Sequence, residues 1–186
     1  MEAPWKPTKE QVQAAYGQTM TDVIAPDLKV LFCGINPSLY SAAVDHMFAR
    51  PGNRFWKTLH GAGFTPRLYS PFEDQELLKL GYGITNLAEP ATARADELTK
   101  EQLLEGREIL ENKLMRYRPK FLGILGITAY RSAFSQPKAR MGLQPERIQG
   151  VNIWVLPNPS GLNAHYQLPA LQRVYLELRL ASEAKS

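Results

Sequence analysis

Apolar and polar positions along the chain predict short buried strands that alternate with amphipathic helices. Four short apolar runs are bounded by Gly, Pro or Asn, which is typical of strands buried in a parallel sheet. These runs are residues 29–33, 82–87, 120–126 and 152–156. Strands that alternate with helices predict an α/β fold, a three-layer α/β/α arrangement with a short, mainly parallel central sheet.

Capping signals mark where the helices between these strands begin. Thr8, Ser70 and Thr99 are each followed three residues later by Gln or Glu, the pattern of a capping box. The predicted helices are residues 9–16, 54–61, 71–80, 100–118, 127–134 and 168–178. Residues 39–52 have no clean period and are predicted to be a functional loop, and residues 137–150 a basic loop.

The first residues of the chain combine proline with mixed charge. We therefore expect residues 1–20 to form a partly ordered N-terminal extension and residues 21–186 to form a single domain. Because that composition indicates weak packing, deletion of residues 1–20 is expected to leave the function of the domain intact.

Composition places the chain among ordinary globular proteins. It has 186 residues, of which 44% are hydrophobic and 22% charged. No apolar run approaches the roughly 18 residues of a membrane span, and the N-terminal residues lack the apolar core of a signal peptide. Cys33 is the only cysteine, which excludes an internal disulfide and an iron–sulfur cluster. We expect a cytoplasmic protein of the bacterial cytosol or nucleoid.

The net charge of +4 is unevenly distributed along the sequence. The stretch from Lys113 to Arg147 holds eight Lys or Arg residues and one acid, Glu146. A basic surface is what a phosphate-binding protein requires. Charge alone, however, favours the simpler interpretation of a solvated face.

Two of the predicted strands end in the same tripeptide, Asn-Pro-Ser, at residues 36–38 and 158–160. Pro37 restricts Asn36 to an extended backbone. In open α/β sheets, ligands bind at the carboxyl ends of the strands. Two carboxamides are therefore expected at one edge of the sheet, although a single Asn before Pro is more often only a turn residue.

Several other classes of site have no signal in the sequence. The three histidines are not paired at metal-ligand spacing, no glycine-rich loop could hold a phosphate, and no serine lies in a nucleophile elbow. The sequence therefore predicts no metal and no cofactor.

Four motifs resemble one known family. They are GINPS at residues 34–38, FARPGNRFW at 48–56, GITNL at 83–87 and LPNPSGLN at 156–163. In this order they are similar to the mismatch-specific uracil-DNA glycosylases, the Mug and thymine-DNA glycosylase branch of the uracil-DNA glycosylase superfamily. The likeness extends from about residue 21 to 180.

The resemblance implies a role for individual residues in the pocket. Asn36 would hold the attacking water, and Phe48 would stack on the flipped base. The backbones of Ile35 and Phe48 would hydrogen-bond the edge of the base. Ser41 would lie near the pocket, and Asn158 would help to fix the base.

The same resemblance implies how DNA would be held. Gly161, Leu162 and Asn163 would form a wedge that fills the space left by the flipped uracil. Basic residues would contact phosphates. Glu89 is a possible assisting acid, with an ion pair as the simpler interpretation. The chain departs from the family pattern at Ser38, where Gly is common, and at residues 164–165, where a small residue and Arg are commoner.

The resemblance implies a monofunctional DNA glycosylase without a cofactor. It would hydrolyse the N-glycosidic bond of uracil in double-stranded DNA that contains U·G or related mismatches, and leave an abasic site for base excision repair. It would act as a monomer and have no membrane partner. Two alternatives stay open on the same fold. One is a non-catalytic module that binds mismatched DNA, and the other is a hydrolase of free nucleosides.

Overall fold

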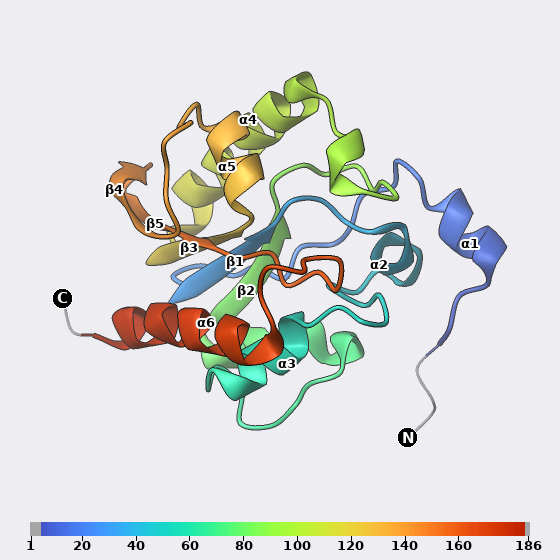
Figure 1. The fold of residues 1–186 in the computed structure, drawn as a ribbon, viewed down its shortest axis with the longest axis horizontal. Helices are drawn as coiled ribbons and strands as arrows, with labels where there is room; N and C mark the ends of the chain where they lie inside the picture. Colours follow the sequence, from blue (N-terminus) through green and yellow to red (C-terminus); the bar gives the residue numbers. More distant parts are fainter. Residues whose placement is uncertain (1–4, 185–186) are drawn as a thin grey trace.

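A five-stranded sheet forms the centre of the molecule, in the order β2-β1-β3-β5-β4 (Figure 1). The computed structural model describes residues 5–184. Four strands run parallel, and the edge strand β4 is antiparallel to β5. The strands are β1 (Val30–Gly34), β2 (Tyr82–Asn86), β3 (Phe121–Leu125), β4 (Gly142–Ile148) and β5 (Val151–Leu156).

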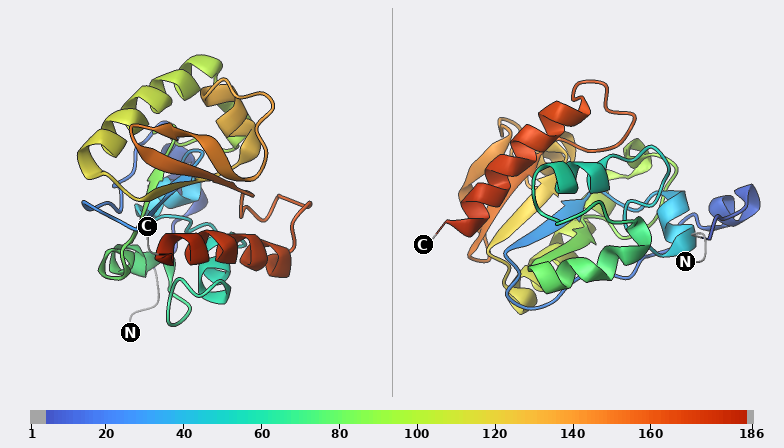
Figure 2. Two further views of the ribbon diagram at one scale, coloured as in Figure 1. Left: turned by 90° about the vertical axis from the view of Figure 1, so that its left-hand side faces the viewer. Right: turned by 90° about the horizontal axis from the view of Figure 1, so that it is seen from below.

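Helices cover both faces of this sheet, which confirms the predicted three-layer α/β/α fold (Figure 2). Helices α3, α6 and the 3-10 helix η1 lie on one face, and α4 and α5 on the other. The helical elements are α1 (Lys9–Ala14), α2 (Leu39–Val44), α3 (Phe55–Gly61), η1 (Pro71–Leu80), η2 (Ala95–Glu97), α4 (Lys100–Tyr117), α5 (Ile127–Ala133) and α6 (Leu168–Glu183). Within the described residues, no helix is long and apolar enough to cross a membrane.

The apolar runs become strands because successive side chains enter opposite layers. On β1, Phe32 packs edge-on against Phe55 of α3, at 5.5 Å between ring centroids, and lies in the layer of α3 and α6. Leu31 and Cys33 enter the other layer, against α4 and α5. All five residues of β1 are buried, which is why the run is almost continuously apolar.

Two segments that were predicted to be loops contain regular structure. The prediction of a loop over residues 137–150 is wrong for β4, whose side chains are mostly exposed and which contains Pro145. An exposed edge strand has no apolar alternation to reveal it. The prediction for residues 39–52 is wrong for α2, which begins immediately after Ser38. The Ser38 hydroxyl accepts a hydrogen bond from Ser41 N at 3.1 Å and caps this six-residue helix.

The N-terminal extension is more closely packed than its composition suggests. The capping box of Thr8 and Gln11 is present at the start of α1, as predicted. Residues 16–19 are exposed, but the expectation of weak packing is wrong for Ala15, which is 1% exposed and packs against Ala42 and Ala91. Residues 1–4 of the predicted extension lie outside the described residues.

Candidate active site

The carboxyl ends of β1, β2, β3 and β5 open into one pocket. The segments after β1, β2 and β5, together with the loop after α2, form its walls. As expected, the two Asn-Pro-Ser turns meet there. Of the residues that the sequence singles out, the pocket is lined by Ile35, Asn36, Ser38, Ser41, Phe48, Asn158, Leu162 and Asn163.

Asn36 is held in one orientation by its amide nitrogen. Nδ2 donates to the carbonyl of Pro90 at 2.9 Å and to the hydroxyl of Thr92 at 2.8 Å. The Thr92 hydroxyl in turn donates to the carbonyl of Arg94 at 2.7 Å, so its lone pair is available to Asn36. Because both Asn36 N–H groups are used, Oδ1 is left as an acceptor for a ligand.

Phe48 is placed by hydrogen bonds to the preceding residue. Met47 N donates to Oδ2 of the buried Asp74 at 2.9 Å, and the Trp56 indole donates to Met47 O at 3.1 Å. Phe48 itself adopts a positive φ of 52°, and its ring stacks on Phe55 at 4.1 Å between centroids. A left-handed backbone at a bulky residue costs free energy, so the surrounding contacts must hold it.

Asn86, at the end of β2, is a pocket residue that the sequence analysis did not single out. It is 8% exposed, and its amide nitrogen has Met47 Sδ as a weak partner at 3.7 Å. Gly34 makes room for it, since a Cβ there would lie 2.6 Å from Asn86 Oδ1 and 3.3 Å from the Phe48 ring. The GITNL motif could have revealed Asn86 as a pocket residue. Its Asn lies at the end of a buried strand, just as Asn36 lies shortly after the end of another.

Ser41 connects α2 to the loop that carries Phe48. Its hydroxyl accepts hydrogen bonds from Ala49 N at 3.0 Å and from the Ser38 hydroxyl at 3.1 Å. It is 3% exposed. Across residues 5–184, the N–H groups of Ile35 and Phe48 make no hydrogen bond to another residue, so both can donate to a ligand.

Asn158 shapes the loop after β5, which we call the wedge loop (residues 158–166). Its Oδ1 accepts from Ser160 N at 2.9 Å, and its carbonyl accepts from the Asn163 amide at 3.0 Å. These bonds close a tight turn. At the tip, Leu162 is 72% exposed, and Gly161 approaches Gly52 so closely that a Cβ would lie 2.8 Å from its carbonyl oxygen.

Arg54 holds the wedge loop against α3, a role that the sequence analysis missed. Its guanidinium donates to four carbonyls of the loop: Ser160 at 2.6 Å, Asn163 at 3.1 Å, Pro159 at 3.4 Å, and Tyr166. Its backbone N–H also donates to Pro159 O at 3.1 Å. A planar group with five donors suits such a set of converging carbonyls. FARPGNRFW contains this arginine, but sequence alone does not reveal its acceptors.

Glu89 lies outside the pocket lining and faces Lys113, with 3.5 Å between Oε1 and Nζ. Lys113 also contacts Asp22 at 2.7 Å. Burial alone lowers the pKa of Lys113, but the hydrogen bond to Asp22 and the nearby carboxylates together raise it above its ordinary value. This geometry favours the ion pair for Glu89, and the mechanism proposed below does not use it as an acid.

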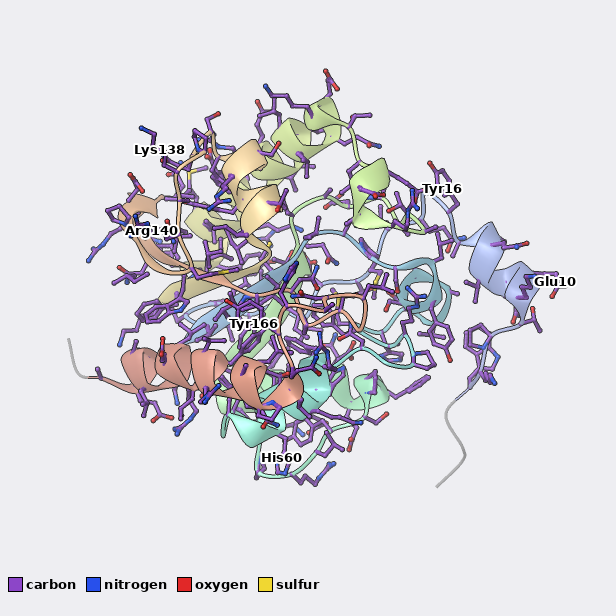
Figure 3. The ribbon with its side chains drawn as sticks, in the orientation of Figure 1. Glu10, Tyr16, His60, Lys138, Arg140 and Tyr166 are labelled. Carbon is purple, nitrogen blue, oxygen red and sulfur yellow. The ribbon has the colours of Figure 1, made fainter. Side chains whose placement is uncertain are left out.

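None of the Lys and Arg side chains between Lys113 and Arg147 belongs to the pocket lining. Lys138 and Arg140 lie beside α5 and β4, on the opposite side of the view from α2 (Figure 3). Arg131 donates to the carbonyl of Ala139. The arginines that do line the pocket are Arg50 and Arg94, which come from other parts of the chain.

Nucleophilic chemistry by Cys33 is disfavoured by its surroundings. Burial raises the pKa of this thiol to about 12, so the thiolate is scarce at neutral pH. Within residues 5–184, no three His, Cys, Asp or Glu side chains are grouped so that they could hold a metal ion.

Comparison with known proteins agrees with this geometry. The model of the uracil DNA glycosylase superfamily matches residues 21–179. The chain therefore belongs to the uracil DNA glycosylase superfamily, whose members are hydrolases that act on DNA. Its fold is similar to the solution NMR structure of a candidate uracil DNA glycosylase from Methanosarcina acetivorans, with a TM-score of 0.57 and 17% sequence identity over 88% of this chain and 98% of that one.

Proposed function

We propose that this protein is a monofunctional glycosylase that removes uracil from mismatched double-stranded DNA, with U·G as its preferred substrate. The observation that carries the proposal is the fixed carboxamide of Asn36. Both of its N–H groups are bound to the loop at residues 90–92, and its oxygen is free in a pocket lined by Phe48 and Asn86. Family membership supports the same reaction class.

Asn36 Oδ1 would accept a hydrogen bond from the attacking water. An amide cannot take up the proton as a carboxylate would, so it orients the water and favours positive charge on the sugar. The reaction would therefore pass through an oxocarbenium-like state in which the bond to uracil is largely broken before water attacks. Water then adds to the anomeric carbon, and its proton is lost to solvent.

The departing uracil carries a delocalised negative charge that needs donors. The free N–H groups of Ile35 and Phe48, and the Asn86 amide, are available to it. Donors that are already oriented stabilise developing charge without reorganisation. None of the lining side chains among the described residues is a lysine, so no primary amine is placed to form a Schiff base with the sugar. This supports a monofunctional enzyme.

Extrusion of the base would be supported by the wedge loop. Leu162 is exposed at its tip and lines the pocket, as expected of a side chain that enters the stack where the uracil left. Arg50 and Arg94 line the pocket and would contact backbone phosphates near the flipped nucleotide, although Arg94 is paired with Asp96 at 3.1 Å in the free protein.

The proposal is tested by incubating the protein with four substrates: duplexes that contain U·G, U·A or T·G, and single-stranded uracil. Cleavage at the abasic sites measures base release. We expect release from U·G to be fastest. Binding to U·G without base release would indicate the non-catalytic module instead. Release of uracil from free nucleosides would indicate the nucleoside hydrolase. In that case the rate on DNA substrates should also be indifferent to salt and to DNA length.

Arg54 allows a separate prediction about the wedge loop. Arg54→Met keeps a long apolar stem but removes the donors to four loop carbonyls. We expect excision from duplex U·G to fall roughly tenfold or more, the scale of one hydrogen bond from a charged donor, about 1.5–3 kcal/mol. Single-stranded uracil should be affected much less, because no duplex has to be opened. Single-turnover rates on both substrates measure the difference.

The matched control is Lys57→Met, an exposed residue on α3, which should leave both rates unchanged. Equal slowing of both substrates by Arg54→Met would contradict a role confined to the wedge loop.

A further inference from the structure

Residues 15–20 precede the part of the chain that the family model matches, and they contact the loop that holds Asn36. We propose that this segment, which we call the N-terminal strap, is a positioning element for the Asn36 carboxamide. The inference rests on the proposed function, because it assigns the strap a part in that reaction. It reverses the expectation that residues 1–20 are dispensable.

The strap binds the one residue that lies between the two acceptors of Asn36. These acceptors are the carbonyl of Pro90 and the hydroxyl of Thr92, and Ala91 separates them. Ala91 N donates to the carbonyl of Gln18 at 2.9 Å, and Gly17 N donates to the carbonyl of Ala91 at 2.8 Å. Both backbone polar groups of Ala91 are therefore bound by the strap.

Peptide planarity carries this restraint directly to the active site. The carbonyl of Pro90 and the N–H of Ala91 belong to the same rigid peptide group. When Gln18 fixes the N–H, it also fixes the direction of the oxygen that accepts from Asn36. The next peptide group is held from both sides, by Gly17 at its carbonyl and by the Pro37 carbonyl, which accepts from Thr92 N at 3.3 Å.

Packing anchors the strap on both sides of this contact. Before it, Ala15 is buried against Ala42 of α2 and against Ala91 itself, and α1 lies beside α2 (Figure 1). After it, the N–H and the hydroxyl of Thr21 each bind the Asp45 carboxylate at 2.9 Å. Small side chains at all three alanine positions permit this close approach.

The strap also reaches the pocket itself, because Met20 belongs to its lining. Without the strap, Ala91 would exchange its two hydrogen bonds for bonds to water, while the bond from Thr92 N to Pro37 would remain. The fold should therefore persist, and the loop at residues 90–92 should lose its fixed orientation. Asn36 would then be less well oriented towards the water.

The test uses the full-length chain with Ala15→Arg, which places a large charged side chain where a buried methyl group lies. We expect single-turnover excision of uracil to slow about ten- to a hundredfold, the scale for a misplaced catalytic group. The dissociation constant for a duplex with a non-cleavable uracil analogue should stay unchanged. The matched control is Ala14→Arg, at the neighbouring exposed alanine, and it should leave the rate unchanged.

A double-mutant cycle separates positioning from general damage. If the strap acts through Asn36, Ala15→Arg should cause no further loss in a chain that already carries Asn36→Ala. The same fold-loss in both backgrounds would overturn the proposal, and so would a wild-type rate for Ala15→Arg.

A second variant, Gly17→Pro, keeps the proposal falsifiable if Ala15→Arg fails to fold. It removes the N–H that donates to Ala91 and cannot adopt the φ of 77° found at Gly17. We expect the same loss of rate, and a wild-type rate would overturn the proposal. Absence of uracil release by the wild-type protein would instead overturn the proposed function, so the two failures are distinguishable.

Discussion

Asn36→Ala is expected to slow single-turnover release of uracil by about thirty- to a thousandfold. This corresponds to roughly 2–4 kcal/mol of barrier, the scale of losing one well-placed polar group at a reacting centre. Asn36 is partly buried at the pocket edge, and its amide bonds only to Pro90 and Thr92. Folding and DNA binding should therefore stay nearly intact, as measured by thermal melting and by the affinity for a U·G duplex.

The matched control for this variant is Asn112→Ala, on the exposed face of α4, which should leave the rate unchanged. A wild-type rate for Asn36→Ala would assign the chemistry to another group. Asp96 would then be the carboxylate to examine, because it lines the pocket whereas Glu89 does not.

The parallel strands and most of the helices could be predicted from the sequence because their signals are local. Each parallel strand is a short apolar run with a break at its end, and capping boxes are indeed present at Thr8, Ser70 and Thr99. The position of Asn36 could also be predicted from its neighbours in the sequence, because Pro37 keeps it extended just after β1. Local signals failed where side chains are exposed, as on β4.

The contacts that orient the candidate catalytic group could not be predicted in this way. Asn36 bonds to residues more than fifty positions away in the sequence, and Gln18 is even further along the chain from its partner Ala91. Alanine and glycine have no reactive or hydrogen-bonding side-chain group. Nothing in the N-terminal composition therefore signals that the strap contacts an active-site loop. Only the folded backbone reveals this link.

Charge along the sequence was a poor guide to charge at the site. The Lys and Arg residues between Lys113 and Arg147 do not line the pocket, and Lys113 is engaged with Asp22 and Glu89. The arginines at the pocket, Arg50 and Arg94, come from loops of mixed composition. A sheet brings together the ends of strands that are distant in sequence, so a functional surface need not be one run of like charges.

Leu162→Ala is expected to separate base flipping from chemistry. Leu162 is 72% exposed in the free protein, so it gains apolar contact only when it enters a DNA stack. Removing most of that side chain should cost on the order of 1–3 kcal/mol in the flipped complex. Excision from duplex U·G should then fall about ten- to a hundredfold. Single-stranded uracil leaves no gap in a duplex, so its rate should fall much less.

The alternative is that Leu162 covers the core beneath the wedge loop. Truncation would then lower the melting temperature and slow both substrates alike. Leu180→Ala is the matched control, because Leu180 is 54% exposed on α6, outside the pocket lining, and its truncation should change neither rate. Because so much of the Leu162 side chain already contacts solvent, its loss should leave the melting temperature unchanged. Equal slowing of both substrates together with a lower melting temperature would remove Leu162 from the site.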